Sequence, residues 1–389
     1  MLQSFFRCVD IPCVLIHGIS KGVTYDVGDV MSREKHCNSW NAVYVENTWR
    51  LVHCHWASKS ARGYYSGNWV TVDCPEFRFN DVEGESRSYI VSSLINDYYF
   101  FTDPAIFIHK CFPFDERWQL LSKKLTKEEF ETCPFLQPAF FALNLGLVDE
   151  KLSCVLYTRE KFVLPIRMPL GAVDRLRFSY NLYRLRNSWD EGEYDYPSLE
   201  RFTLHYCVRD IAFFEVRFPP LSNGDYKLQV FCSDDQICLP SEWICDFRIV
   251  CEKGMDVSVP LPVVPQIGWG RNPELAKHGI TAVSHTDGYY SLDNDSLVFE
   301  FVFPAEAESH AELLKHKCSR SEYADYVTVE RDGVNVCVKA EAPCSGEFAL
   351  QIFCQQEGGL GYVNVMNYLL KRSVFAEVGE KYEGLLCLI

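Results

Sequence analysis

Two histidines flank a cysteine at His53, Cys54 and His55, and the pair His36-Cys37 lies shortly before them in the sequence. Imidazole and thiolate are the ligands that zinc prefers, and on a strand His53 and His55 would point to one side while Cys54 points to the other. A tetrahedral site would then need further ligands from His36 and Cys37, but adjacent side chains rarely aim at one point. We therefore predict no metal site here: the histidines line a cleft and Cys54 belongs to the core.

The chain holds 18 cysteines in 389 residues, with no Cys-x-x-Cys pair. Two alternatives stay open: reduced, buried thiols in a cytoplasmic protein, or disulfides in an exported one. The first is favoured, because residues 1–10 lack a basic segment and Arg7 and Asp10 interrupt any apolar leader. The other histidine–cysteine pairs have no partner pair at finger-like spacing, and we interpret them as structural: His109 with Cys111, His205 with Cys207, and His316 with Cys318.

Charge and composition exclude several classes of function. The formal net charge is −15, from 38 basic and 53 acidic residues, which argues against a nucleic-acid partner. Hydrophobic residues make up 48% of the chain and charged residues 23%, as in ordinary globular proteins. No apolar run is long enough for a transmembrane helix, so we expect no membrane span.

The second half of the chain contains an internal repeat. NGDYKLQVFC at residues 223–232 resembles SGEFALQIFC at residues 345–354, and the two glycines, Gly224 and Gly346, are separated by 346 − 224 = 122 residues. Residues 176–180 and 298–302 are apolar runs at a matching distance upstream, and residues 245–249 and 366–370 match downstream. A period of this length suits tandem domains rather than solenoid units.

Each repeat has the pattern of an antiparallel β-sandwich. Tyr226, Leu228 and Val230 alternate with polar residues along one expected strand, and Asn223-Gly224 is a turn signal in front of it. Short strands of this kind, with few helical segments, are typical of immunoglobulin-like sandwiches. We expect two such domains, at residues 141–255 and 256–389, that supply scaffold or binding surfaces.

The first 140 residues differ and are predicted to be mixed α+β. Residues 11–16 form an expected buried strand, and residues 42–45 and 49–56 an expected hairpin across residues 46–48. A short helix should begin after Thr126, with Glu129 as its capping-box partner.

The hairpin carries a resemblance to a known family. NSWNAV at residues 38–43 and WRLVH at residues 49–53, followed by Trp56, resemble the transglutaminase-like cysteine-protease superfamily. Residues 97–104, 107–109, 112–113 and 118–121 are similar to its kyphoscoliosis peptidase and hillarin branch. The resemblance implies a transglutaminase-like, papain-like domain at residues 1–140, followed by immunoglobulin-like modules, and it covers nearly the whole chain.

The departures from the family pattern concern its catalytic residues. The resemblance implies a catalytic histidine where this chain has Asn38, and an orienting aspartate where it has His53. It implies a nucleophilic cysteine upstream of Met1, so the nucleophile position is absent from this sequence. An amide cannot take a proton from a thiol. A swapped arrangement, with His53 as base and Asn38 orienting it, would need a substitute thiol, for which the candidates are Cys8, Cys37 and Cys54.

We therefore predict no catalytic residue, no bound cofactor and no metal. The resemblance implies a catalytically inactive scaffold protein of the cytoplasm, associated with the cytoskeleton through protein partners. The alternative is a cysteine peptidase or transglutaminase whose nucleophile lies upstream of Met1 in a longer product.

Overall fold

The computed structural model describes most of the chain and divides it into two compact units. The first unit contains residues 1–200 and 215–258, and the second contains residues 201–214 and 259–389. The described residues are 2–22, 25–58, 60–65, 68–72, 89–92, 96–185, 199–236, 239–264, 268–270, 273–292, 296–356, 358 and 361–372. For the strands between residues 60 and 92, only the backbone is described.

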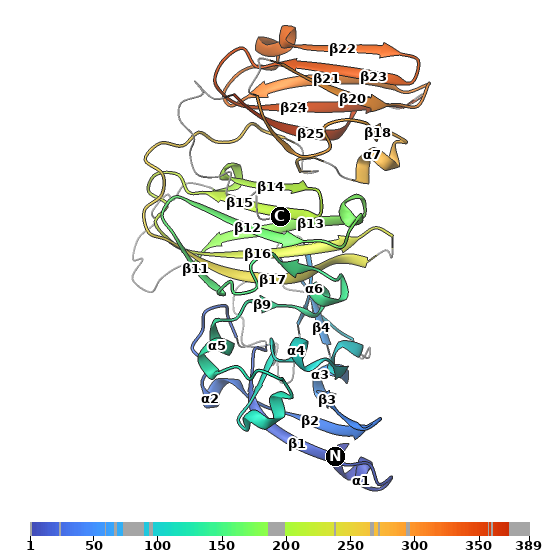
Figure 1. Ribbon diagram of the computed structural model, residues 1–389. Helices are drawn as coiled ribbons and strands as arrows, with labels where there is room; N and C mark the ends of the chain where they lie inside the picture. The colour runs from blue at the N-terminus through green and yellow to red at the C-terminus, as the bar shows by residue number, and fades with distance from the viewer. Residues whose placement is uncertain are drawn as a thin grey trace. The chain divides into compact units, whose positions relative to one another are not determined.

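A five-stranded sheet organises the first part of the chain. Its order is β7-β3-β2-β1-β8, and β1, β2 and β3 lie side by side in Figure 1. The bounds are β1 Cys13–Ser20, β2 Cys37–Val45, β3 Thr48–Val52, β7 Phe100–Thr102 and β8 Cys111–Pro113. Val45 pairs with Thr48, and the two loop residues Glu46 and Asn47 have φ values of 51° and 60°. Such a turn matches the twist of the strands that it joins, and the expected hairpin is confirmed.

Short helices and a second, smaller sheet complete the first part of the chain. The helices are α1 Leu2–Arg7, α2 Arg33–His36, α3 Cys54–Ser58, η1 Asp97–Tyr99, α4 Pro104–Phe107, η2 Glu116–Gln119, α5 Lys127–Thr132 and α6 Pro138–Ala142. A second sheet has the order β5-β4-β6, with bounds Asn68–Val72, Ser60–Tyr65 and Tyr89–Ser92. None of the helices in the described part of the chain is long and apolar enough to cross a membrane.

The capping box predicted for α5 is present. The Thr126 side chain accepts a hydrogen bond from the Glu129 backbone at 3.1 Å, and the Glu129 carboxylate accepts one from the Thr126 backbone at 2.7 Å. Two amide groups that lack helical partners are thereby satisfied, which fixes where α5 begins.

Two β-sandwich modules follow, and they share one strand order. In the first module, β10 Gly146–Leu147, β12 Lys161–Arg167, β15 Ile211–Arg217 and β14 Thr203–Val208 form one sheet in the order β10-β12-β15-β14. The other sheet has the order β11-β17-β16-β13, with bounds Val155–Thr158, Leu239–Cys251, Gly224–Asp234 and Leu176–Arg184. The short strand β9, Phe135–Leu136, also pairs with β17.

The second module repeats this arrangement. One sheet has the order β18-β20-β23-β22, with bounds Thr281–Ala282, Ser296–Val302, Asn335–Glu341 and Val327–Asp332. The other has the order β19-β25-β24-β21, with bounds Tyr289–Ser291, Val363–Arg372, Gly346–Gln355 and Glu308–Lys315. The remaining elements of the two modules are η3 Ala172–Asp174, η4 Glu200–Phe202, α7 Pro273–Lys277 and η5 Arg320–Tyr326. The order of the strands in both modules is that of immunoglobulin-like sandwiches, as predicted.

The strand order confirms one part of the predicted repeat and corrects another. β16 and β24 are equivalent, and they begin at Gly224 and Gly346, the two glycines of the repeat. The upstream match was wrong, because residues 176–180 lie in β13 whereas residues 298–302 lie in β20, and these strands occupy different positions in the sandwich. The connections between strands differ in length between the two modules. A constant spacing of 122 residues therefore matches β13 of the first module to β20 of the second, although these strands are not equivalent.

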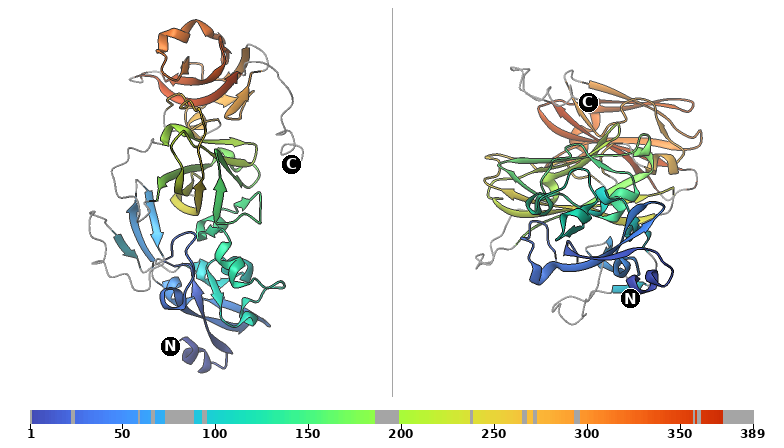
Figure 2. Two further views of the ribbon diagram at one scale, coloured as in Figure 1. Left: turned by 90° about the vertical axis from the view of Figure 1, so that its left-hand side faces the viewer. Right: turned by 60° about the horizontal axis from the view of Figure 1, so that its bottom comes forward.

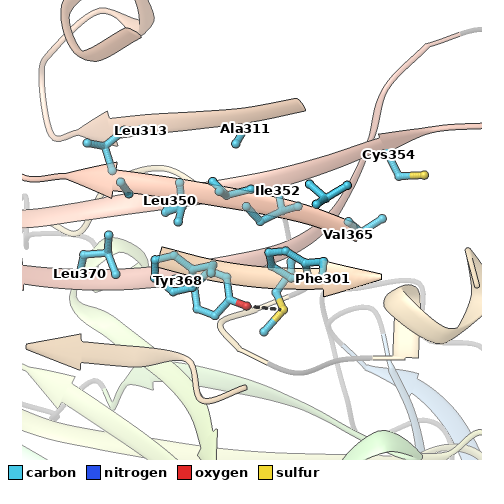
Figure 3. Close-up of a cluster of buried hydrophobic side chains, with 14 of the residues drawn as sticks. Phe301, Ala311, Leu313, Leu350, Ile352, Cys354, Val365, Tyr368 and Leu370 are labelled. Atoms are coloured by element: carbon cyan, nitrogen blue, oxygen red, sulfur yellow. Dashed lines mark hydrogen bonds between the residues drawn. The ribbon is translucent and has the colours of Figure 1, made fainter. Parts of the chain in front are cut away.

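The core of the second module shows why the repeat keeps its apolar alternation. Leu350 and Ile352 from β24 and Tyr368 and Leu370 from β25 are buried beside Phe301 from β20 (Figure 3). The Tyr368 hydroxyl donates to Met366 Sδ at 3.1 Å, so its polar atom is satisfied inside the core. In the left view of Figure 2 the strands of this module, in orange and red, curve around that core. Each fully buried side chain of this size stabilises the module by about 1.5–3 kcal/mol.

Candidate functional site

Asn38 lies on β2, opposite Gly18 of β1. Its Nδ2 donates to Ser20 Oγ at 2.8 Å, and its Oδ1 accepts from the backbone N–H of Ser39 at 2.7 Å. Both ends of the amide are therefore engaged in local hydrogen bonds. An amide has no basic nitrogen, so the Asn38 side chain cannot serve as a proton acceptor.

His53 lies where β3 ends and α3 begins, and its side chain caps that helix. The imidazole Nδ1 accepts a hydrogen bond from the backbone N–H of Trp56 at 3.2 Å. The ring stacks on the Trp56 indole, with centroids 4.2 Å apart and planes 10° apart, and on Trp40, with centroids 6.5 Å apart. Tyr99 meets the ring edge-on at 6.1 Å. The imidazole is thus held in a fixed orientation by three aromatic side chains.

The protonation state of His53 follows from this environment. The side chain is 1% exposed, and burial, with a smaller contribution from His55, lowers the pKa of His53 to about 3. The ring is therefore neutral at physiological pH, and because Nδ1 is the acceptor its proton sits on Nε2. The buried Nε2 has no hydrogen-bond partner among the residues that the structure describes. The one lone pair of the neutral ring is used in the hydrogen bond from the Trp56 backbone.

Asn38 and His53 do not act on one another. Asn38 and Trp40 are alternate residues of β2 and share a face of the sheet, and the Trp40 ring is the group that stacks on His53. No hydrogen bond joins the Asn38 amide to the His53 ring in the described part of the chain. Asn38 lies within β2 and His53 directly follows the neighbouring strand β3, but their side chains do not form a hydrogen-bonded pair among the described residues.

The three candidate thiols differ in exposure and in their hydrogen bonds. Cys8 is exposed and donates to Ser4 O at 3.3 Å, and Cys37 is exposed at the start of β2. Cys54 is half-buried in α3, where burial, and next to it Cys13, raises the pKa of its thiol. A raised pKa disfavours the thiolate, which is the nucleophilic form. None of the three thiols is hydrogen-bonded to a histidine within the described residues.

The strand expected to run through residue 56 is wrong beyond residue 52. β3 ends at Val52 and residues 54–58 form α3, because the His53 side chain caps the helix. His53 and His55 are thus not alternate residues of one strand. Within the described ranges no group of three or more His, Cys, Asp or Glu side chains could hold a metal ion. The fifteen described cysteines are free thiols, and Cys74, Cys238 and Cys387 lie outside the described residues.

The contacts of two lysines, Lys21 and Lys227, were not predicted from the sequence. Lys21 is 0% exposed, and its Nζ donates to Cys133 O at 3.1 Å and to Cys133 Sγ at 3.3 Å. Lys227, on β16, contacts Asp246 at 3.2 Å and Asp26 at 2.6 Å. Asp26 is 201 residues from Lys227 in the sequence, and the pairing of β16 with β17 brings Asp246 beside Lys227.

This fold places the chain in a known class. Residues 127–262 and 271–377 match the KY-like, immunoglobulin-like domain. These two segments cover more than half of the chain and coincide with the two sandwich modules, so the chain belongs to the family with this domain.

Its relatives match along nearly the whole chain. It is 30% identical over 363 residues to Hillarin of Drosophila melanogaster, a match that covers 89% of this chain and 42% of that protein. It is 27% identical over 358 residues to Lim and transglutaminase domain protein ltd-1 of Caenorhabditis elegans, covering 90% and 47%. It is 25% identical over 373 residues to Kyphoscoliosis peptidase of Mus musculus, covering 95% and 49%. The chain spans less than half the length of these relatives, and the resemblance to the kyphoscoliosis peptidase and hillarin branch is confirmed.

A solved structure that resembles the chain is the I-band fragment I67–I69 of titin, with 10% sequence identity and a TM-score of 0.16 over 56% of this chain and 62% of that one. The assignment of the modules to the immunoglobulin-like class rests on their strand order and on the family match.

Proposed function

We propose that residues 1–140 form a transglutaminase-like domain without a catalytic base, and that the chain acts as a scaffold that binds protein partners. The relatives named as a peptidase and as a transglutaminase-domain protein support the fold class. The paired strands β2 and β3 support it further, because they carry the residues of the resemblance, with Ala42 opposite Leu51.

The observation that carries the proposal is the hydrogen bond from the Trp56 backbone to His53 Nδ1. It occupies the lone pair that a general base would need, while Asn38 offers only an amide. Loss of a positioned base costs about 10²–10⁴-fold in rate. The inference depends on Asn38 and His53 alone, and it applies whatever sequence precedes Met1 in a longer product.

The test is a pair of activity assays on the purified chain: hydrolysis of unstructured protein substrates and incorporation of a primary amine into glutamine-containing substrates. We expect no turnover in either assay, and no change on replacing His53 with Asn, which can also cap a helix. Turnover that disappears in His53→Asn but persists in His17→Asn, an exposed histidine on β1, would reject the proposal.

A cysteine peptidase or transglutaminase is the second candidate, favoured by the names of the relatives at 25–27% identity. It requires a thiol upstream of Met1 and a base other than Asn38 and His53. If a longer product of the same gene is active, the second candidate predicts that replacing its upstream cysteine abolishes the activity, whereas His53→Asn does not. The scaffold proposal predicts that a longer product with an intact fold is inactive in both assays.

The partners are proposed to be cytoskeletal proteins, and the protein to be cytoplasmic. Cosedimentation with actin filaments and with microtubules tests this directly. The chain should pellet with one of the two polymers and stay in the supernatant without it, and failure to pellet with either would remove the cytoskeletal part of the proposal.

A further inference from the structure

A lysine and an exposed thiol meet at one end of the second module. Lys315 is the last residue of β21, and Cys344 lies just before β24. Lys315 Nζ is 3.0 Å from Cys344 Sγ and donates to Ser345 O at 2.8 Å. Cys344 is exposed, so a small oxidant in solution can reach its sulfur.

The Phe348 ring and the missing side chain of Gly346 allow Lys315 to lie beside the sulfur. Its Nζ lies over the Phe348 ring, 5.0 Å from the centroid, as in a cation–π contact. Gly346 has a φ of 127°, and a Cβ built there would be 2.9 Å from Lys315 Cε. A side chain at residue 346 would therefore displace the lysine. Because Gly346 has no side chain, the Lys315 side chain can cross the start of β24 and place its nitrogen beside Cys344.

The first module has the same arrangement with different chemistry. Arg184, the last residue of β13, lies across Gly224, whose added Cβ would be 2.8 Å from Arg184 Nη2. The guanidinium is 5.9 Å from the Tyr226 ring. The residue two positions before Gly224 is Ser222, which corresponds to Cys344 in the repeat. The shared scaffold thus carries a cation at this position in both modules; the second module pairs it with the thiol of Cys344, whereas the first has Ser222 at the corresponding residue.

We propose that Lys315 and Cys344 form an oxidation site, at which hydrogen peroxide converts the thiol to a sulfenic acid and the lysine amine traps it as a sulfenamide. In the first step the O–O bond of peroxide breaks, sulfur is oxidised, and one oxygen leaves as water. In the second step the ammonium gives up a proton, nitrogen attacks sulfur, and the S–O bond breaks. The sum is one thiol, one ammonium and one peroxide giving one S–N bond, two waters and one proton.

The consequence is protection of Cys344. A sulfenic acid that is not trapped proceeds to sulfinic and sulfonic acids, which thiols do not reduce. A sulfenamide returns to thiol and amine on reduction. Cys37 is the internal reference, because it is also exposed and makes no hydrogen bond to a lysine in the described part of the chain. Cys318 is a competing partner, since it lies three residues after Lys315 and contacts the Tyr323 hydroxyl at 3.5 Å.

The experiment treats the purified chain with hydrogen peroxide and maps its peptides by mass spectrometry before and after dithiothreitol. We expect a linked pair of peptides containing Lys315 and Cys344, lighter by two hydrogens than their sum, that dithiothreitol separates. Lys315→Arg and Cys344→Ser place the first module's own residues at these positions, so the folded module should tolerate them. In Lys315→Arg the linked pair should vanish, and the recoverable thiol at Cys344 should fall severalfold, toward the level of Cys37.

Three results would overturn the proposal. The first is a disulfide from Cys344 to Cys318 or to another cysteine in place of the bond to Lys315. The second is a sulfinic acid at Cys344 with Lys315 free. The third is a Cys344 thiol that stays unmodified while Cys37 is oxidised. Equal unfolding temperatures of the parent chain and of Lys315→Arg would show that a difference in their oxidation products comes from the loss of the amine and not from a loss of stability.

Discussion

The backbone N–H of Trp56 donates to His53 Nδ1 at 3.2 Å, and the indole of the same Trp56 stacks on the ring that it caps. The two contacts together bury the imidazole and assign its proton to Nε2. His53 is thereby part of the structural support of α3.

His53 should make the stability of the first unit dependent on pH. The pKa of His53 is lowered from 6.5 to about 3 in the folded state, so below pH 6.5 the unfolded chain binds a proton that the folded chain does not. Stability should therefore fall as the pH drops from 6.5 toward 3, by roughly 1 kcal/mol for the first unit of pH below 6.5. Urea unfolding at a series of pH values measures this slope. His53→Asn should reduce it, while His17→Asn should not, and an unchanged slope in His53→Asn would show that this histidine is not the buried neutral group described.

Lys227 should stabilise the folded state where β16 pairs with β17. Burial opposes its charge, but Asp246 and Asp26 together raise the pKa of Lys227 above its ordinary value. Replacing Lys227 with Met leaves the fully buried Asp246 without its cation and should cost about 3–5 kcal/mol of unfolding free energy at neutral pH. Lys127→Met, which removes a surface pair with Glu131, is the control and should cost far less.

The loss in Lys227→Met should also depend on pH. Burial raises the pKa of Asp246 from 3.8 to about 6 even with Lys227 present. A raised pKa means that the folded state holds a proton that the unfolded state has lost, so the contribution of Asp246 to stability falls as pH rises through this range. Without Lys227 the pKa of Asp246 in the folded state should rise further, so the pH range over which stability falls should extend to higher pH. The variant should be closest to the parent near pH 4, and a difference that is constant with pH would argue against an ionised Asp246.

Thr126→Ala should remove the cap of α5. The Thr126 hydroxyl accepts from the Glu129 backbone, and its loss should cost about 1 kcal/mol of unfolding free energy. Ser319→Ala is the matched control, because Ser319 precedes η5 without a capping hydrogen bond from its side chain. Equal losses in the two variants would show that the capping box of α5 contributes nothing measurable.

Gly18→Ala should disrupt the first sheet. An added Cβ would be 2.2 Å from Phe112 O on β8 and 2.4 Å from the Trp40 ring, so either the strand or the indole that stacks on His53 must move. We expect a loss of about 3 kcal/mol or more, as for overpacked core positions against a rigid backbone. Gly361→Ala, with nothing within 4 Å of the added atom, should leave the unfolding temperature unchanged. A Gly18→Ala chain of normal stability would contradict the close packing of β1 on Trp40.

Local signals in the sequence predicted local structure correctly. The capping box at Thr126 and the start of β16 at Gly224 each depend on only a few neighbouring residues. Both features were predicted and both are found in the structure. The immunoglobulin-like class followed from alternation and from the repeat. The limits proposed for the domains, near residues 140 and 255, stay predictions.

Long-range relationships were not predictable in the same way. The environment of His53 is built by Trp40 on another strand, by Trp56 within a helix that had been assigned to a strand, and by Tyr99. Likewise, the partners Lys227 and Asp246 meet only through the pairing of two strands. Charge and spacing carry no signal for such contacts, because the fold itself decides which side chains share a buried face.

The most direct test of the account is the protonation state of His53, measured by nitrogen NMR on the chain labelled in its histidines. His53, assigned by its loss in His53→Asn, should stay neutral with its proton on Nε2 from about pH 7.5 down to about pH 5. A His53 resonance that titrates near its ordinary value of 6.5, or that carries its proton on Nδ1, would contradict the account and reopen this histidine as a catalytic base.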